Sequence, residues 1–232
     1  MSNLVPIETL DRRSLIRGLA LALTAVGTLD LDAAQHVHTE TGANKAKNGT
    51  YKVKAFTPEE YKTLERLAVL IVPADDVSGS ALDAGAPAFI DTLASQNEQL
   101  ADIFHGGLAW MDAEMRKRFQ VESFVSAKPE QQTALLDTLV KAQQEETARR
   151  TEESLYSRTP IYKDFSGYTV KRANDLGPGI FFFDWVRKMT VDAFYTSPIG
   201  VKDLGYQGNR ALGRYTVPQA AMDYAMKRSP FA

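Results

Sequence analysis

Cysteine is absent from this chain of 232 residues. The absence excludes a disulfide framework, iron–sulfur ligation by thiolates, covalent haem attachment through a C-x-x-C-H motif and a cysteine nucleophile. A protein without disulfides depends on its hydrophobic core, and a chain of this length can bury a sizeable one. The length therefore predicts one domain without covalent cross-links.

Histidine is scarce, and the common catalytic motifs are missing. The chain has three histidines. It has no G-x-G-x-x-G after a strand, no phosphate-binding loop and no G-x-S-x-G nucleophile elbow. His36 and His38 fall in a polar segment, where we expect both in solvent. Asp75 and Asp76 could coordinate a hard cation, but a solvated loop is the simpler interpretation. We expect no catalytic, cofactor-binding or metal-binding residue in this chain.

His105 is the histidine that the pattern places inside the domain. It lies on a predicted helix, with Asp102 one turn before it and Asp112 two turns after it. This arrangement could support a general base, so an enzyme that uses His105 is one alternative. A surface or interface histidine is the simpler interpretation, and we expect that the chain is not an enzyme by itself.

Neither sign of charge dominates the sequence. Basic residues number 27 and acidic residues 29, for a net charge of −2. Nucleic-acid binding needs clustered positive charge, so the balance gives no electrostatic case for it. Long hydrophobic runs are also rare. The run from Leu15 to Leu29 is shorter than the roughly 20 apolar residues that a membrane-spanning helix needs.

The N-terminal segment resembles a twin-arginine export signal. Arg12 and Arg13 precede the polar Ser14, and the mildly apolar run Leu15–Leu29 follows them. That run has the length of the apolar region of a signal peptide. We expect residues 1–34 to be a signal that takes the chain, already folded, through the twin-arginine translocase to the periplasm. An amphipathic or buried N-terminal helix is the alternative.

The end of this signal is less well marked. Ala33 and Ala34 are small, but Leu31 and Asp32 occupy positions where a peptidase prefers small residues. Cleavage after Ala33 or Ala34, and retention of the signal as a weak anchor at the inner membrane, both remain open. Residues 35–56 are polar and show no apolar period, so we expect a linker or an extended arm there.

The apolar spacing predicts a mainly α domain over residues 57–232, with about five to seven helices. Thr57-Pro58-Glu59-Glu60 is typical of a helix start with a capping box, and Pro73 ends that helix. Gly106 and Gly107 lie inside another predicted helix and indicate a kink or a close helix approach. Further helices are expected over residues 86–95, 98–119, from 129 into the charged stretch 141–153, 180–194 and 219–227. No convincing strand is present.

Several short segments form a series with a characteristic order and spacing. They are Thr57–Glu60, Thr63–Ala68, Ile71–Asp76, Ala84–Ala86 and Phe89–Asp91, followed by Phe181–Tyr195 and Gly205–Asn209. The series resembles the gluconate 2-dehydrogenase subunit 3 family over roughly residues 57–210, most specifically over 57–91. One departure is an insertion between Ser197–Gly200 and Gly208-Asn209, in the family's closing motif.

The resemblance implies a small helical subunit that acts with a larger partner. That partner is an FAD-dependent dehydrogenase of the glucose–methanol–choline type, which oxidises a sugar, a sugar acid or a polyol. Its electrons pass to a cytochrome c subunit or another acceptor, not to NAD or oxygen. The large subunit typically lacks a signal of its own. The resemblance thus implies that this chain binds no cofactor and serves as export carrier and stabilising chaperone. A stand-alone periplasmic binding or structural protein is the other alternative.

Aromatic residues are concentrated in one predicted helix. Residues 181–183 are phenylalanines and residue 185 is tryptophan, so their side chains point nearly all round the helix axis. One domain of this size can bury one face of such a helix, and a partner would cover the rest. A fully buried central helix is the alternative. The candidate interface residues are Phe181, Phe182, Trp185, Tyr195 and Tyr206.

Overall fold

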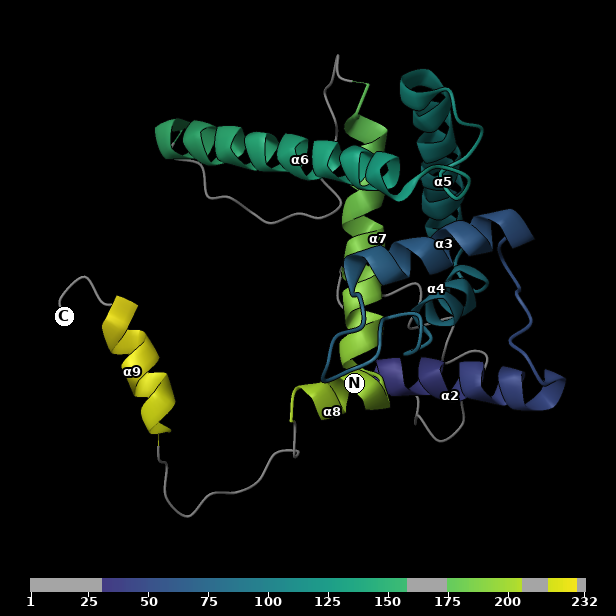
Figure 1. The fold of residues 1–232 in the computed structure, drawn as a ribbon, viewed down its shortest axis with the longest axis horizontal. Coiled ribbons are helices and arrows are strands. Elements are labelled where there is room, and N and C mark those ends of the chain that lie inside the picture. The colour runs from purple at the N-terminus through teal and green to yellow at the C-terminus, as the bar shows by residue number, and fades with distance from the viewer. Residues whose placement is uncertain (1–30, 158–174, 206–216, 229–232) are drawn as a thin grey trace, which may run out of the picture.

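The computed structural model describes residues 31–157, 175–205 and 217–228, with side chains up to residue 147 in the first range (Figure 1). These residues form helices and no strands, so the expected mainly α fold is confirmed. The helices are α2 (Leu31–Asn48), α3 (Pro58–Ile71), α4 (Ala86–Ala94), α5 (Glu98–Phe119), α6 (Pro129–Ser157), α7 (Gly177–Tyr195), α8 (Pro198–Asp203) and α9 (Gln219–Arg228).

Helix α3 begins as its sequence predicts. The Thr57 hydroxyl accepts a hydrogen bond from the Glu60 amide at 3.3 Å, and the Glu60 carboxylate accepts one from the Thr57 amide at 2.8 Å. This reciprocal pair satisfies two amides that the first turn of a helix leaves without partners. Leu64 and Leu67 then recur on the inward face and are at most 1% exposed. Local sequence therefore fixes both the start and the buried face of α3.

Helix α7 is the centre of the fold. It packs against α3, α4, α5, α6 and α8, and Figure 1 shows it running through the middle of the other helices. Two glycines allow its close contact with α5. A Cβ added at Gly107 would lie 2.0 Å from Cγ of Phe182, and one at Gly179 would lie 2.1 Å from the Trp110 ring. The Phe182 ring of α7 thus packs on Gly107 of α5, and the Trp110 ring of α5 packs on Gly179 of α7. This packing confirms the close helix approach expected at Gly107.

Helix α2 replaces much of the expected linker over residues 35–56. Ala33, Ala34 and Val37 are buried, and α2 packs on α4. The expectation of a linker or an extended arm was wrong over residues 35–48, because the buried face of α2 consists of only three residues, too few to give a visible apolar period. His38 is also not in solvent. Its Nε2 lies 3.0 Å from the Thr196 hydroxyl, whereas His36 is exposed as expected.

The remaining helices lie at the edges of the fold. Figure 1 shows α6 extending beyond the body and α9 set apart from the other helices. Residues 217–227 are all exposed, including large side chains at Met222 and Met226. Among the described helices, none combines the length and the apolar character that a membrane crossing requires. Residues 1–30, and with them Arg12 and Arg13, lie outside the described part of the chain.

Candidate partner interface

The outward side of α7 carries a stripe of partly exposed residues. Phe181, Trp185, Lys188, Asp192 and Tyr195 follow one another at intervals of four, three, four and three residues. Residues at this spacing share one face of a helix. None of the five is fully buried, while the residues between them include much of the core. We call these five residues the α7 stripe.

Aromatic and charged groups contact one another along this stripe. The Phe181 and Trp185 rings meet edge to face, with centroids 6.5 Å apart. The Lys188 ammonium lies 5.9 Å from the centroid of the Trp185 ring, within the range of a cation–π contact. Both contacts orient the indole of Trp185, which is partly buried against the core. The stripe therefore presents one edge of a large aromatic group in a fixed position.

Asp192 adds an acid to the stripe. Burial raises the pKa of the Asp192 carboxyl, and the nearby positive charge of Lys188 opposes the shift only in part. Desolvation disfavours the charged form of a carboxylate. A partner that supplied a donor to Asp192 would therefore restore interactions that partial burial has removed.

The last residue of the stripe lies where α7 gives way to α8. Tyr195 is 37% exposed and packs edge to face on Phe194, with ring centroids 5.0 Å apart. Leu204, at the end of α8, is 60% exposed. Apolar side chains thus reach the surface at this end of the molecule. Tyr206 falls outside the described residues.

Phe182 does not belong to the interface. It is 1% exposed, lies on Gly107 and meets the Phe104 ring edge to face with centroids 5.6 Å apart. The expectation that Phe182 faces a partner is therefore corrected. The four aromatic residues divide between the two sides of the helix, because Phe182 and Phe183 point inward while Phe181 and Trp185 point outward.

His105 has a partner that its neighbours in sequence did not suggest. Its Nδ1 lies 2.7 Å from Oε1 of Glu60, whereas Asp112 accepts a hydrogen bond from the Phe124 amide at 2.8 Å. Burial alone would raise the pKa of Glu60, but the hydrogen bonds from His105 and Thr57 outweigh it and lower this pKa. Since Glu60 also caps α3, the pair joins the start of α3 to α5.

A cleft of about 630 Å³, lined by charged, polar and apolar side chains, opens beside this pair. It lies between the first turns of α3, the middle of α5 and the loop that precedes α6. Its walls carry charges of both signs, from Glu59 and Lys62 on α3 and from Asp112 and Arg116 on α5. The Arg116 guanidinium donates to the Glu122 carbonyl oxygen at 2.9 Å and so helps to hold the loop. The mixture of charges does not single out one ligand chemistry.

Asp75 stabilises the loop after α3 through hydrogen bonds. Its carboxylate accepts hydrogen bonds from the amides of Val77 and Ser78, both at 2.8 Å, and these bonds lower its pKa. Over the described residues, no group of three or more His, Asp or Glu side chains could hold a metal ion.

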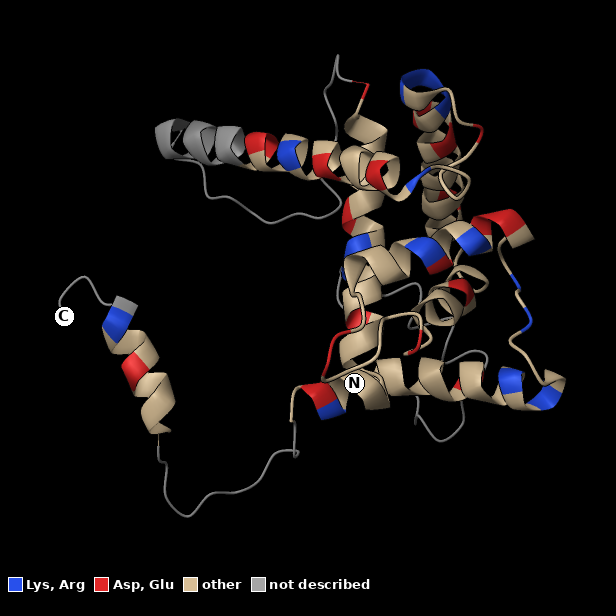
Figure 2. Ribbon diagram, viewed as in Figure 1, with Lys and Arg blue, Asp and Glu red and all other residues tan. Residues whose placement is uncertain are grey.

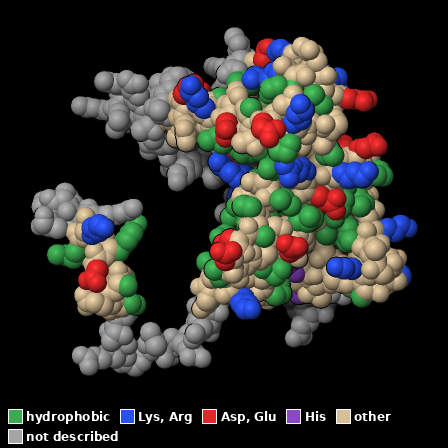
Figure 3. All heavy atoms as spheres, in the orientation of Figure 1, with side chains coloured by type: hydrophobic (Ala, Val, Ile, Leu, Met, Phe, Trp, Pro, Cys, Tyr) green, Lys and Arg blue, Asp and Glu red, His purple; other side chains and the backbone are tan. Residues whose placement is uncertain are grey.

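Charges of both signs cover the surface. Figure 2 shows acidic and basic residues interspersed along α3, α5 and α6, and the space-filling view shows apolar side chains between them on the visible face (Figure 3). The α7 stripe places three partly exposed aromatic residues, Phe181, Trp185 and Tyr195, on one face of a single helix. We take this stripe as the candidate partner interface.

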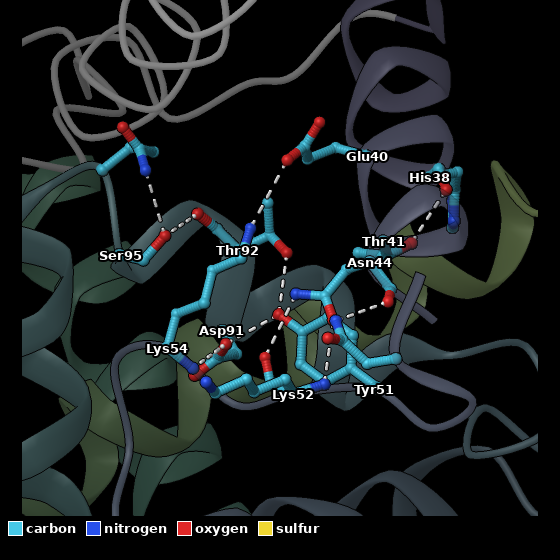
Figure 4. A network of polar contacts seen from close by, with 12 residues as sticks. His38, Glu40, Thr41, Asn44, Tyr51, Lys52, Lys54, Asp91, Thr92 and Ser95 are labelled. Atoms are coloured by element: carbon cyan, nitrogen blue, oxygen red, sulfur yellow. Dashed lines mark hydrogen bonds and ion pairs between the residues drawn. The ribbon is translucent and has the colours of Figure 1, made fainter. Parts of the chain in front are cut away.

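Asp91 is an organising residue whose role was not evident from the sequence. It is 0% exposed and accepts hydrogen bonds from the Tyr51 hydroxyl at 2.7 Å and from the amides of Lys54, Ala55 and Phe56 at 2.9, 2.9 and 3.2 Å (Figure 4). Burial raises the pKa of Tyr51, which keeps its hydroxyl protonated as a donor. Asp91 thereby fixes the segment between α2 and α3 onto α4. An acidic residue inside the apolar run Ala88–Leu93 was the available signal.

A model of one protein family, gluconate 2-dehydrogenase subunit 3, matches residues 58–213. The chain belongs to the gluconate 2-dehydrogenase subunit 3 family. The match begins at the first residue of α3 and ends beyond α8, so α2 and α9 lie outside it. The comparisons with curated proteins and with solved structures gave no match. As a subunit 3 protein, the chain is related to components of a multi-subunit dehydrogenase, which supports a dehydrogenase subunit as its partner.

Proposed function

We propose that this protein is the non-catalytic small subunit of an FAD-dependent dehydrogenase complex. Its partner is a glucose–methanol–choline-type enzyme that oxidises a sugar, a sugar acid or a polyol, with a cytochrome c subunit or a similar electron acceptor. The observation that carries the proposal is membership of the subunit 3 family over residues 58–213. In this proposal the partner binds FAD and catalyses the reaction, and this chain stabilises the partner.

The α7 stripe is the surface that we assign to the partner. Interface hot spots are enriched in tryptophan and tyrosine, since these side chains combine large apolar area with a polar group. Trp185 and Tyr195 provide such anchors near the two ends of the stripe, and Lys188 and Asp192 lie between them. Because Trp185 is already held by Phe181 and Lys188, binding would cost little side-chain entropy there.

Co-purification tests the assignment. The chain and the flavoprotein are expressed together, and the amount of flavoprotein bound is measured for wild type, Trp185→Ala and Tyr195→Ala. Loss of a hot-spot side chain costs about 2 kcal/mol or more, which weakens binding about 30-fold. Val77→Ala is the control, since Val77 is 79% exposed and lies in the loop between α3 and α4, outside the α7 stripe. Equal recovery by all four proteins would remove the stripe as the interface.

We further propose that the chain carries its partner to the periplasm. The support is the twin-arginine pattern at Arg12 and Arg13 together with family membership. The signal acts on a folded passenger, so a dehydrogenase that has already bound FAD could travel with this subunit. Fractionation of cells for dehydrogenase activity, with and without this chain, tests the proposal. Activity that reaches the periplasm in the absence of the chain would contradict it.

Among the described residues, the pair formed by His105 and Glu60 beside the cleft is the arrangement that most favours catalysis by this chain. Glu60 already bonds to the Thr57 amide, however, so its carboxylate has a structural task. The purified chain alone should give no turnover of gluconate or other sugar acids with an artificial electron acceptor. Turnover by the chain alone, lost in His105→Gln, would establish the alternative and refute the non-catalytic role.

A further inference from the structure

The first turn of α2 contains both positions at which the sequence allows the export signal to end. Ala33 and Ala34 are 3% and 0% exposed. Their backbone is helical, whereas proteolysis favours exposed segments whose backbone is free of hydrogen bonds. Cleavage after either residue of the folded protein would therefore require this part of α2 to leave the body and unwind.

Contacts further along α2 oppose that opening. Ala34 and Val37 belong to the hydrophobic core. His38 lies between α4 and the end of α7, with its ring 4.9 Å from the Phe89 ring and its Nε2 bonded to the Thr196 hydroxyl. The helix is therefore fixed to two other helices within a few residues of the two alanines.

The other end of α2 is fixed as well. The Asn44 side chain accepts a hydrogen bond from the Lys52 amide at 2.9 Å and donates one to the Lys52 carbonyl oxygen at 3.2 Å. The neighbouring Tyr51 is bound to the buried Asp91, so this connection leads directly into the core (Figure 4). Both ends of α2 are thus tied to α4, and the helix is an integral part of the fold.

A cut after Ala34 would also weaken what remains of the helix. It would remove two of the three buried residues of α2, namely Ala33 and Ala34. It would also remove Asp32, the acidic residue of the first turn, and leave an ammonium group at the N-terminal end of the helix. Negative charge is favourable at that end of a helix dipole and positive charge is unfavourable.

We infer that the folded protein is not cleaved after Ala33 or Ala34, and that α2 remains part of the mature subunit. Any removal of the signal is confined to residues before Leu31. The inference rests on the proposed export of the chain. The sequence left open whether the chain is cut after Ala33 or Ala34 or keeps these residues, and the inference is that it keeps them. It makes α2, which lies outside the family match, a permanent part of this subunit.

Intact-mass spectrometry of the exported complex tests the inference. The full chain is expressed with its flavoprotein partner in a bacterium that has a twin-arginine translocase, and the complex is purified from the periplasmic and membrane fractions. The expected mass is that of the full chain or of a chain that begins at or before Leu31. A mature N-terminus anywhere from Asp32 to Asn48 would overturn the inference. If the chain is found only in the cytoplasm, export itself fails, and the following measurement tests α2 independently.

Amide hydrogen exchange of the full-length chain tests the docking of α2. We expect protection of the α2 amides to match that of α4, and Val37→Asp to reduce it at least about tenfold because a carboxylate would enter the core. Val37 is 0% exposed, while Thr39 is exposed on the same helix, so Thr39→Asp is the matched control and should retain the protection. Unprotected α2 amides in the wild type, or equal protection in both variants, would overturn the inference.

Discussion

The contact between α5 and α7 makes a specific prediction about two adjacent glycines. Gly106 and Gly107 occupy neighbouring positions in the middle of α5, yet their surroundings differ. A Cβ at Gly106 would meet no atom within 4 Å. A Cβ at Gly107 would lie 2.0 Å from Cγ, 2.2 Å from Cδ2 and 2.5 Å from Cβ of Phe182. Alanine should therefore stabilise the protein at one position and destabilise it at the next.

The magnitude follows from two opposing effects. Glycine inside a helix is about 1 kcal/mol less favourable than alanine, so Gly106→Ala should gain up to about 1 kcal/mol. Gly107→Ala has the same gain, but Phe182 cannot withdraw freely because it also packs on Phe104. Overpacking of a core costs about 1–3 kcal/mol and occasionally more. Overlap with three atoms of a buried ring places the cost at or above the upper end, so we expect a net loss of about 2 kcal/mol.

Thermal and urea unfolding, followed by circular dichroism, measure both variants. For a chain of this size 1 kcal/mol shifts Tm by about 2–4 °C, so Gly106→Ala should raise Tm by up to about 4 °C and Gly107→Ala should lower it by about 4–8 °C. Phe182→Leu combined with Gly107→Ala should recover part of the loss, since neighbouring substitutions couple. Equal Tm values for the two alanine variants would refute the proposed packing of α5 on α7.

Three further predictions concern other parts of the molecule. Asp91→Ala should lower the free energy of unfolding by about 3 kcal/mol or more in urea titrations, because it removes the acceptor of the Lys54, Ala55 and Phe56 amides and one of the two hydrogen-bond partners of the Tyr51 hydroxyl, and Asp91→Asn should lie between it and the wild type. Burial lowers the pKa of His38, so the folded state prefers the neutral imidazole. The free energy of unfolding should therefore fall as the pH drops below the unfolded-state pKa of about 6.5. His38→Gln is the control, because this variant should lack the His38 contribution to the pH dependence. Replacement of Arg12 and Arg13 by lysine should retain both this chain and the dehydrogenase activity in the cytoplasm, and activity in the periplasm would contradict the carrier role.

Local signals in the sequence were sufficient for some elements and insufficient for others. The start of α3 was predictable because Thr57 and Glu60 satisfy each other's amides within one turn. Helix α2 was not predictable from local signals, because its few small buried residues pack on α4, which lies far along the chain. Its polar composition is compatible with solvent, and only docking on α4 gives Val37 and His38 an apolar environment.

The candidate interface shows the same limit. The sequence identified the aromatic helix. Phe182 is a core residue, however, because its ring packs on Gly107, which lies on another helix, α5. Trp185 follows Phe182 by three residues, so helical spacing alone would place both side chains on neighbouring parts of one face, and the partial exposure of Trp185 depends on how the other helices pack. His105 was likewise assigned to nearby acidic residues, whereas its partner Glu60 lies 45 residues away in the sequence. In each case the missing information was which helix packs against which.

The two sides of α7 connect folding with partner binding. The inward side joins α5 through Phe182 and supplies much of the core, while the outward side carries Trp185 and Tyr195 at fixed positions. The stripe exists as a surface only when the inward side is packed, because the spacing that aligns its residues is that of a formed helix. If the stripe binds the dehydrogenase, as proposed, α7 must be helical in the complex, and a subunit folded in advance already provides this surface. Export of an already folded complex through a twin-arginine signal, as proposed, is consistent with such a subunit.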